Sequence, residues 1–478
     1  MSIYQRCKFF EQPFIYICEN RNIQKFCSYC LRKPQPGKSL MMCGNCKHAR
    51  YCDKNCQRLG WQIHKPDCKR LQRVFPNLPL SEVMFLARAL DRLKFIEEHG
   101  DKHNWQKDRP FWELLGHQEE KKKDKEIMDH FEKISERVDK FMGEDAVSRD
   151  YLFDVFCRVS VNSHSIHNSV GDEVGMALDL GVSRYDHSCR PNCTLVFDGF
   201  RACLRPLQGG FDAADWKKGR ISYTDVGKSR YRRRRMLQSK WHFFCECERC
   251  MDPEDDRLTA IKCVNPKCDE PIVIHEESPA QRITCPKCKA ITEPERILEA
   301  QELMKSLPES FPHELEDEKL CAELRGHLAN AEHLLHSENI YYCRLLTAAT
   351  HVDPKTNSNP EMHKLVYNNY RRCFPQSDRH TGYQLLHIVR SLIEQGRREE
   401  CTPYAYEAMT IFEVVFGLDH PYYLQTLALW TFLDNKDATK TDEDLLNLMN
   451  FNYSRPLDIS ALLQPDFNAN EPAIQTVQ

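Results

Sequence analysis

The stretch Tyr185–Cys193, with the sequence YDHSCRPNC, places an acid, an imidazole and a thiol directly before a Pro-Asn turn. Two further motifs follow it along the chain, ISYTD at 221–225 and FFCECERC at 243–250. This order of residue types is too specific for a connecting loop, and it indicates a functional segment. Asp186, at the head of the motif, needs an explanation of its own.

The length of the chain limits how it can be organised. Its 478 residues exceed what one hydrophobic core usually organises, which predicts about two to four domains. Hydrophobic residues make up 41%, charged residues 29%, and the formal net charge is −3. These values are typical of a soluble globular chain and give no global charge excess for nucleic acid or membranes.

The N-terminal stretch 1–20 is unlike a signal peptide, because Arg6, Lys8 and Glu11 interrupt its apolar residues. No apolar run in the chain approaches the ~20 residues of a membrane helix. We therefore interpret the protein as intracellular, without membrane attachment, and predict that it occurs in cytoplasm and nucleus.

The 24 cysteines are numerous for a chain kept in reducing conditions, where thiols serve metals or catalysis more often than disulfides. Eight potential metal ligands fall within residues 27–68, which is the complement of two tetrahedral zinc sites. Two C-x2-C pairs are followed by CDKNC and HKPDC, whose ligands are one helical turn apart. The spacing predicts two interleaved zinc sites rather than buried apolar cysteines. The eight ligands are Cys27, Cys30, Cys43, Cys46, Cys52, Cys56, His64 and Cys68.

Residues 25–73 are strongly basic, with 12 Lys or Arg side chains against Asp53 and Asp67. Seven zinc thiolates and two zinc ions would leave a net surplus of about +7. A basic face of this size could attract nucleic acid or acidic partners, and a merely solvated surface is an equal alternative.

The segment 27–68 resembles a MYND zinc finger, and with the three motifs downstream the chain resembles the SMYD family of protein-lysine methyltransferases. The resemblance implies that Cys27, Cys30, Cys52 and Cys56 hold one zinc, and that Cys43, Cys46, His64 and Cys68 hold the other. So small a domain should need its metal in order to fold, which leaves it a role in recognition, such as docking proline-rich peptides.

The resemblance also implies an α+β multidomain fold, in which a SET β-fold is split by the finger and followed by a cysteine-rich post-SET zinc region and a C-terminal helical, TPR-like domain. The first four predicted parts are a residual N-terminal SET strand at 1–26, the finger at 27–68, a helical connector at 69–150 with a solvated segment at 117–126, and the SET core at 151–244. The last three are the post-SET zinc region at 245–292, the TPR-like helices at 293–462 and a disordered tail at 463–478.

Two more zinc sites are expected after the finger. The family pattern implies a third zinc that clips the opening motif to the post-SET region, with Cys189, Cys245, Cys247 and Cys250 as ligands. The quartet Cys263, Cys268, Cys285 and Cys288 has the spacing of a zinc ribbon, and on spacing alone we predict a fourth zinc there. The expected cofactors are therefore three zinc ions, a fourth if the ribbon binds metal, and S-adenosylmethionine.

The same resemblance assigns the active site. It makes Tyr223 the catalytic residue, whose hydroxyl orients the reacting amine and methyl group, and it implies a cofactor site formed by Asn162, Asp186, His187, Tyr223 and Phe243. Taken singly, Asn162 would be an ordinary turn residue, while His187 and Phe243 would be core residues. Only the surrounding motifs favour a functional role for these three residues over a structural one.

The sequence departs from the family pattern at several positions. Asp186 stands where the family has Asn, and a carboxylate cannot donate the hydrogen bond that an amide can. Trp241 replaces a second active-site tyrosine, and DAADWKKGR replaces a Gly-Glu-Glu-Leu step. The first glycine is Gly37, so the family's N-terminal Gly-x-Gly cofactor segment is missing. Two explanations would account for the missing segment. The protein is a degenerate enzyme retained for binding, or the sequence begins at an internal start.

The C-terminal third reads as helices with apolar residues at spacings of three and four, and 396–421 resembles a tetratricopeptide helix pair. Such helices would form a wall beside the SET core that gates a peptide substrate. The run KSRYRRRR at 228–235 is interpreted first as a solvated helix, with an acidic-partner patch and a nuclear import signal as alternatives.

We therefore expect a monomeric protein-lysine N-methyltransferase that uses S-adenosylmethionine to modify a target lysine of histone or non-histone proteins. The alternative is a catalytically impaired SET/MYND scaffold that binds protein partners through its finger and helical domain.

Overall fold

In the computed structural model of the protein, the described residues are 6–35, 37–168, 170–308, 311, 318–436 and 439–450. The predicted tail at 463–478, the last residues of the predicted helical domain and the first five residues of the chain lie outside them. Among the described residues, none of the helices has the length and apolar character that a bilayer span requires.

The N-terminal segment contributes to two separate sheets. Strand β1 (Lys8–Phe10) pairs antiparallel with β9 (Arg201–Pro206), and β2 (Ile15–Cys18) pairs antiparallel with β6 (Glu173–Leu178). The sequence predicts one residual strand here, and the structure has two. Because both partners lie beyond the finger and the connector, the strands at 8–18 join the start of the chain to its central fold.

The central strands form two three-stranded sheets and one short parallel pair. The sheets have the orders β1-β9-β8 and β2-β6-β5, with β5 at His164–His167 and β8 at Cys193–Asp198. The parallel pair joins β7 (Asp186–His187) to β10 (Arg220–Ile221) and sets His187 opposite Ile221. This register brings the opening motif beside the segment that carries Tyr223.

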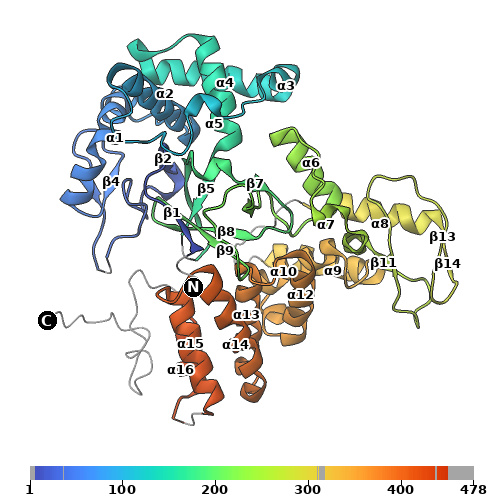
Figure 1. Ribbon diagram of the computed structural model, residues 1–478. Coiled ribbons are helices and arrows are strands. Elements are labelled where there is room, and N and C mark those ends of the chain that lie inside the picture. The colour runs from blue at the N-terminus through green and yellow to red at the C-terminus, as the bar shows by residue number, and fades with distance from the viewer. Residues whose placement is uncertain are drawn as a thin grey trace.

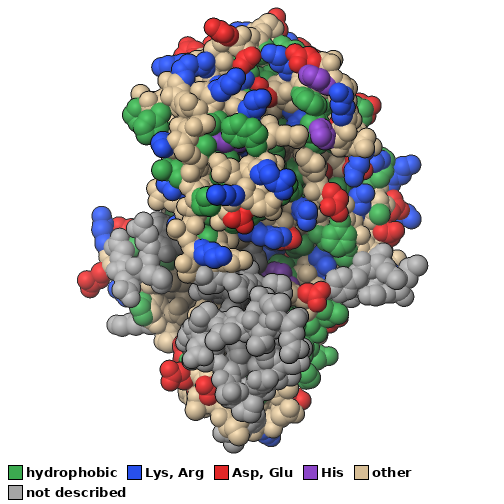
Figure 2. Space-filling view, turned by 90° about the vertical axis from the view of Figure 1, so that its left-hand side faces the viewer, with side chains coloured by type: hydrophobic (Ala, Val, Ile, Leu, Met, Phe, Trp, Pro, Cys, Tyr) green, Lys and Arg blue, Asp and Glu red, His purple; other side chains and the backbone are tan. Residues whose placement is uncertain are grey.

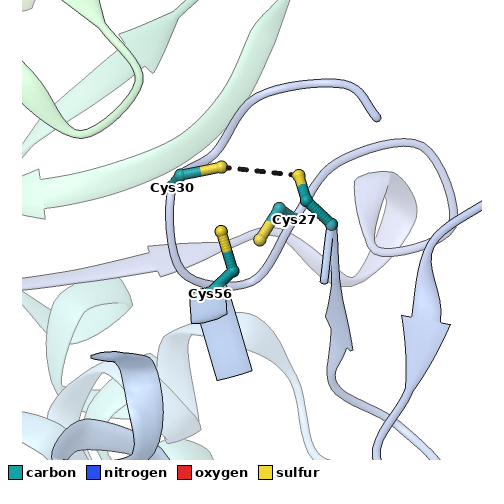
Figure 3. A group of neighbouring side chains, drawn as sticks. Cys27, Cys30 and Cys56 are labelled. Atoms are coloured by element: carbon teal, nitrogen blue, oxygen red, sulfur yellow. Dashed lines mark hydrogen bonds between the residues drawn. The ribbon is translucent and has the colours of Figure 1, made fainter. Parts of the chain in front are cut away.

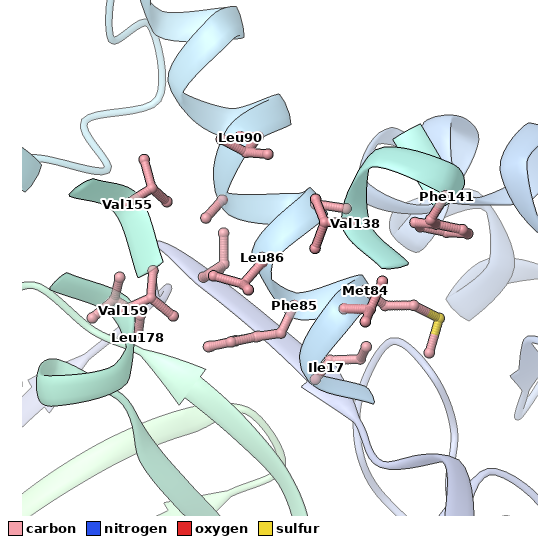
Figure 4. Packing of buried hydrophobic residues seen from close by; sticks show 14 of the residues in the cluster. Ile17, Met84, Phe85, Leu86, Leu90, Val138, Phe141, Val155, Val159 and Leu178 are labelled. Carbon is pink, nitrogen blue, oxygen red and sulfur yellow. The ribbon is translucent and has the colours of Figure 1, made fainter. Parts of the chain in front are cut away.

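A helical lobe covers one side of these strands (Figure 1). Helix α2 (Ser81–His99) packs against β2, α4 (Lys125–Met142) and α5 (Arg149–Asn162). Its buried side chains meet those of α4, α5 and β2 in one apolar core, as Figure 4 shows. Burial at about 25 cal/mol per Å2 of apolar surface stabilises this lobe. Helix α5 leads directly into β5, which fixes the place of Asn162 at the helix end.

The charged segment 117–126 is only partly solvated. It contains helix α3 (Gln118–Lys123), whose Lys121 is buried and donates to the Cys157 carbonyl at 3.1 Å. The expected solvated segment is therefore wrong at Lys121. The long stem of this side chain covers apolar surface while its ammonium finds a carbonyl.

The finger consists of the short strands β3 (Met41–Met42) and β4 (Arg50–Tyr51) and helix α1 (Lys54–Val74). Asp53 caps α1 by accepting a hydrogen bond from the Cys56 amide at 2.8 Å. The helix continues past the predicted finger boundary at residue 68 into the helical lobe.

After the central strands come α6 (Arg230–Trp241), α7 (Glu248–Met251), the 3-10 helix η6 (Pro253–Thr259) and two small hairpins. The first hairpin pairs β11 (Ile261–Lys262) with β12 (Pro271–Ile272) and the second pairs β13 (Ile283–Thr284) with β14 (Ile291–Thr292). In Figure 1 these hairpins and α8 lie to one side of the central strands.

The C-terminal helices that follow α8 (Pro294–Ser306) lie on the opposite side of the strands from the α2–α5 lobe (Figure 1). They are α9 (Glu318–Leu334), α10 (Ile340–Val352), α11 (Pro354–Asn357), α12 (Pro360–Cys373), α13 (Arg379–Glu394), α14 (Thr402–Val415), α15 (Pro421–Asp434) and α16 (Asp442–Leu448). Helices α12 to α15 pack successively, each against the next, and α14 also contacts β9. There the Arg205 guanidinium donates to the Val414 carbonyl at 2.9 Å.

The basic run at 228–235 is not a solvated helix, which corrects the first interpretation from the sequence. It forms the start of α6, and Arg233 is fully buried. Arg230 pairs with Asp256 at 3.1 Å, and Arg234 donates to the Cys245 carbonyl at 2.9 Å. Most of these arginines therefore hold the post-SET region rather than face an external partner.

A buried ion cluster lies at the centre of this region. Asp255 accepts from Arg233 at 2.6 Å and from Arg249 at 2.7 Å, and all three side chains are at most 3% exposed. The nearby carboxylate raises the pKa of Arg233 above its ordinary value against the opposing effect of burial. Asp255 is the common counterion of both guanidinium groups.

Arg249 also connects three distant parts of the chain. Its Nη1 donates to the carbonyls of Val226 at 2.8 Å, Cys373 at 2.6 Å and Cys189 at 3.4 Å. These belong to the segment after β10, the end of α12 and the opening motif. One guanidinium thus links the opening motif, the segment that follows Tyr223 and the C-terminal helices.

Asp255→Asn should lower the thermal unfolding midpoint strongly, because it leaves two buried guanidinium groups with no carboxylate. Breaking a buried pair in this way costs about 3–5 kcal/mol. The matched control is Arg282→Gln, which removes an exposed ion pair with Glu293 at 3.0 Å and should cost at most about 1 kcal/mol. Equal melting of both variants, measured by circular dichroism, would contradict a structural role for the cluster.

Candidate active site and zinc centres

The first finger cluster consists of Cys27, Cys30, Cys52 and Cys56, whose sulfur atoms all lie within 4.8 Å of one another. The side chains of the three labelled cysteines in Figure 3 converge on one point from the turn at 27–30 and the start of α1. The Cys30 and Cys52 sulfur atoms are 3.7 Å apart. A disulfide needs about 2.05 Å, whereas tetrahedral zinc with bonds of about 2.3 Å separates its sulfur ligands by about 3.8 Å.

The second finger cluster joins Cys43, Cys46, His64 and Cys68, and all four are buried. The Cys43 and Cys68 sulfur atoms are 3.8 Å apart, and Nε2 of His64 lies 3.5 Å from the Cys46 sulfur. Burial lowers the pKa of His64 to about 4, so its imidazole is neutral and can bind metal through Nε2. The donor set is that of a Cys3His structural zinc site.

The third cluster brings Cys189 of the opening motif to Cys245, Cys247 and Cys250 of the post-SET region. The Cys189 and Cys250 sulfur atoms are 3.6 Å apart, although 61 residues separate them in the chain. Nε2 of His187 lies 3.2 Å from the Cys189 sulfur. The active-site motif and this cluster are therefore in direct contact.

The fourth cluster lies on the two small hairpins and contains Cys263, Cys268, Cys285 and Cys288. Its sulfur separations are 3.5 Å for Cys263 and Cys288 and 3.8 Å for Cys268 and Cys285. All sixteen ligands predicted from the sequence are thus brought together as four quartets. Their separations and donor types fit zinc at each place.

A cavity of about 1360 Å3 opens beside the third cluster, between the central strands, the helical connector and the first turn of α13. All five residues predicted for the cofactor site line it: Asn162, Asp186, His187, Tyr223 and Phe243. They come from the end of α5, from β7, from the segment after β10 and from the segment after α6. A cavity of this size and polarity can accommodate a nucleoside with an attached amino acid.

Tyr223 is held with its hydroxyl in a defined position. The hydroxyl donates to the Tyr185 carbonyl at 2.6 Å, and the Tyr223 amide donates to Nδ1 of His187 at 3.0 Å. Burial and the Asp186 carboxylate raise the pKa of Tyr223 above its ordinary value. The phenol is therefore protonated at neutral pH, and its oxygen lone pairs are available as acceptors.

The two other polar residues of the predicted site are also fixed. Asn162 donates through Nδ2 to the carbonyls of Leu115 and Arg158, both at 2.8 Å, which leaves its Oδ1 as an acceptor. His187 accepts at Nδ1, and burial lowers its pKa to about 4. Its ring lies 6.1 Å from that of Phe243, so an aromatic wall flanks the imidazole.

Trp241 closes the cavity beside Tyr223, with 5.2 Å between the ring centroids. Its indole N–H donates to the Val161 carbonyl at 3.0 Å, so the ring presents an aromatic face rather than a polar group. The Lys240 ammonium lies over this ring at 4.5 Å, a cation–π contact worth about 0.5–2 kcal/mol. Trp241 thus offers a different contact from the hydroxyl that a tyrosine would provide.

The sequence does not identify the other charged residues of the cavity, which include Arg109, Arg184, Asp378 and Arg379. Arg109 lies before a short 3-10 helix in the connector, and Asp378 and Arg379 lie at the start of α13. Arg379 donates to the Leu195 carbonyl at 2.7 Å, which holds α13 against β8. Neither segment has a local sequence signal, because only the tertiary fold brings it to the site.

The basic surplus of the finger is partly neutralised by residues outside it. Arg70 is buried and pairs with Asp91 at 2.7 Å and with Asp145 at 2.9 Å, and Arg32 pairs with Asp198 at 2.5 Å. Figure 2 shows Lys and Arg side chains lying among apolar and acidic ones on this side of the molecule. Nucleic-acid binding by the finger stays a prediction from composition.

Comparison with known proteins agrees with this geometry. The MYND finger family matches residues 27–68. Histone-lysine N-methyltransferase SMYD3 of Homo sapiens is 26% identical over 82% of this chain and 84% of its own. Histone-lysine N-methyltransferase ASHR1 of Arabidopsis thaliana is 24% identical over 86% and 87%. SET domain and MYND-type zinc finger protein 6 of Schizosaccharomyces pombe is 31% identical over 50% of this chain and 46% of its own.

Elemental analysis should find four zinc ions per chain, because four quartets have zinc geometry. Cys268→Ser should reduce the content to three and leave the finger and the cavity intact, since its cluster is confined to the small hairpins. Cys203→Ser is the control, because Cys203 belongs to none of the quartets, and it should retain four ions. A content of two or fewer in the unmodified protein would refute the assignment of the third and fourth clusters.

Proposed function

Because the chain belongs to the SMYD family of SET and MYND domain proteins, we propose that it is a protein-lysine N-methyltransferase that uses S-adenosylmethionine and acts on histone or non-histone proteins. The observation that carries the proposal is the convergence of Asn162, His187, Tyr223 and Phe243, from separate segments, on one cavity. Two of the relatives reported above are named as histone-lysine N-methyltransferases and align over most of this chain.

When bound, S-adenosylmethionine supplies a methyl group whose carbon leaves the sulfonium sulfur as the lysine nitrogen attacks it. Tyr223 then has the role of orienting the acceptor. Its hydroxyl proton is engaged by the Tyr185 carbonyl, so its oxygen accepts weak C–H or N–H hydrogen bonds from the reacting groups. Since Tyr223 stays protonated, it does not act as the base that removes the lysine proton.

The lysine side of the cavity is formed by Trp241 and Tyr223. The Lys240 ammonium lies over the indole ring at 4.5 Å, so Trp241 would supply an aromatic wall, and its anchorage on Val161 keeps the ring in place. The substrate lysine must then lose a proton to solvent before it attacks, and burial of the amine in the cavity would favour its neutral form. Orientation and desolvation are the contributions that these residues make.

The proposed partners follow from the same organisation. A protein substrate would enter past the start of α13, where Asp378 and His380 line the cavity. The finger, a protein-interaction module, would dock proline-rich peptides. We further propose a monomer that occurs in cytoplasm and nucleus.

A scaffold that has lost turnover is the second candidate, favoured by Asp186 and Trp241 standing where the family has Asn and Tyr. Calorimetry with S-adenosylmethionine on the full chain distinguishes the two. A micromolar dissociation constant supports the enzyme, and the absence of binding at millimolar ligand favours the scaffold.

Tyr223→Phe should reduce methyl transfer by about 10²- to 10³-fold, because a single positioned hydroxyl contributes this much to an active site. The measurement is transfer of labelled methyl from S-adenosylmethionine to core histones and to a soluble protein extract. Zinc content and melting temperature should stay unchanged, since the substitution removes one oxygen. Tyr383→Phe, which removes the hydroxyl of a cavity residue on α13, is the control and should retain activity. Equal activity of Tyr223→Phe and the unmodified chain would remove Tyr223 from the catalytic role.

A further inference from the structure

Cys7 and Cys203 lie next to each other across the β1–β9 pair, and they belong to none of the four zinc quartets. Phe9 is paired with Cys203 in the antiparallel register. Because side chains alternate along a strand, Cys7 lies on the same face of the sheet as Phe9 and is diagonal to Cys203. The two thiols are in hydrogen-bond contact. This contact places the two sulfur atoms within reach of a disulfide bond.

The face that carries the two thiols is the more exposed face of β1. The opposite face is buried, because Phe10 and Leu204 pack in one apolar cluster with Cys193. Phe9, on the same face as the thiols, is 56% exposed, and β1 is the edge strand in the order β1-β9-β8. Both thiols are half-buried, so a small solute can reach them from the edge of the sheet.

The backbone on either side of Cys7 is held in place. Before it, the Arg6 carbonyl accepts a hydrogen bond from the Ala213 amide at 2.9 Å. After it, Lys8 begins the pairing with β9 opposite Leu204. The contact between the two thiols is therefore set by the sheet and by a second anchor in front of it.

The surroundings of the pair make its two thiols chemically different. The pKa of the Cys7 thiol is lowered to about 7, chiefly by the hydrogen bond with Cys203 and also by the Arg205 guanidinium, while burial opposes the change. The same contact raises the pKa of Cys203 above its ordinary value. At neutral pH Cys7 is therefore partly a thiolate, whereas Cys203 keeps its proton. The thiolate is the form of cysteine that reacts with oxidants.

We propose that Cys7 and Cys203 form a reversible oxidation site, at which a peroxide converts the two thiols into a disulfide that joins β1 to β9. The Cys7 thiolate attacks one peroxide oxygen, so that an S–O bond forms, the O–O bond breaks, and the hydroxide that leaves takes up a proton to become water. The Cys203 sulfur then attacks the Cys7 sulfur. The S–S bond forms, the S–O bond breaks, and the hydroxide leaves as water with the Cys203 proton. A dithiol reductant restores both thiols by exchange.

The disulfide would change how the start of the chain is attached. In the reduced protein, three residue pairs hold β1 on β9. The new bond would make this attachment covalent and would close a loop from residue 7 to residue 203, which contains the finger and the helical connector. Closing so long a loop stabilises the folded state, because it restricts the unfolded chain. This inference is independent of the proposed methyl transfer.

The test treats the full-length, zinc-loaded protein with a small excess of hydrogen peroxide, blocks the remaining thiols and identifies disulfide-linked peptides by mass spectrometry. The main new link should join Cys7 to Cys203, and dithiothreitol should remove it. The melting temperature of the oxidised protein should rise by about 3–8 °C. Before oxidation, iodoacetamide at pH 7 should alkylate Cys7 at least about 10-fold faster than the buried Cys193.

Two variants separate the two steps of the oxidation. In Cys203→Ser, the sulfenic acid at Cys7 has no thiol to react with, so dimedone should trap it there. In Cys7→Ser, Cys203 should stay reduced under the same treatment. Cys193→Ser is the matched control, because Cys193 is near Cys7 but belongs to the buried cluster on the opposite face, and it should keep the link. Melting temperature and zinc content before oxidation verify that each variant is folded.

Three results would overturn the oxidation site. The first is that no link forms, or that Cys7 is linked to Cys193 instead of Cys203. The second is release of zinc before the link appears, since the quartets would then be the more sensitive thiols. The third is equal alkylation of Cys7 and Cys193, which would show that Cys7 is not activated.

Discussion

The position of one buried carboxylate determines how the parts of this protein are assembled. Asp255 balances the charges of Arg233 and Arg249 in the interior, and Arg249 also donates to three carbonyls from distant segments. An unpaired guanidinium at this depth would cost several kcal/mol. The ion cluster therefore stabilises the contact between the opening motif, the segment after Tyr223 and the end of α12.

The third cysteine quartet reinforces the same junction from its other side. Cys189 comes from the opening motif and its three partners come from the post-SET region, so a bound metal would fix the loop that carries His187. Different parts of the chain therefore line the cavity. The connector supplies Arg109, β7 and the segment after β10 supply Asp186 and Tyr223, and the C-terminal helices supply Arg379. No single domain could form such a site.

The sequence predicted the parts of the structure that depend on local spacing. The two finger quartets and the hairpin quartet belong to this class, because closely spaced ligand pairs lie together whatever the rest of the chain does. The third quartet was expected only from the family resemblance, since Cys189 lies 61 residues from Cys250 in the chain. The α+β SET and MYND organisation is confirmed: the MYND finger family matches residues 27–68, and relatives with SMYD names align over most of the chain. The five cofactor residues line one cavity in the structure, and their chemical roles stay a prediction.

Features that depend on tertiary contacts were missed or wrong. Strand β1 is three residues long and has its partner at 201–206. The basic run at 228–235 was interpreted as solvated because a sequence shows charge but does not show Asp255 or Asp256 beside it. Arg109 belongs to no recognisable sequence motif, so its place in the cavity could not be predicted from the sequence.

The placement of β1 and β2 has a consequence for the order of folding during synthesis. All eight finger ligands lie within residues 27–68, so the finger can close as soon as that stretch has emerged. Lys8, however, pairs with Leu204, and at about 5–20 residues per second β1 waits roughly 10–40 s for its partner. Contacts of such sequence separation form slowly, and an unpaired strand exposes its backbone to other chains. The newly made protein would pass through a state in which the finger is folded but β1 is still unpaired. A chaperone would be expected to protect this state.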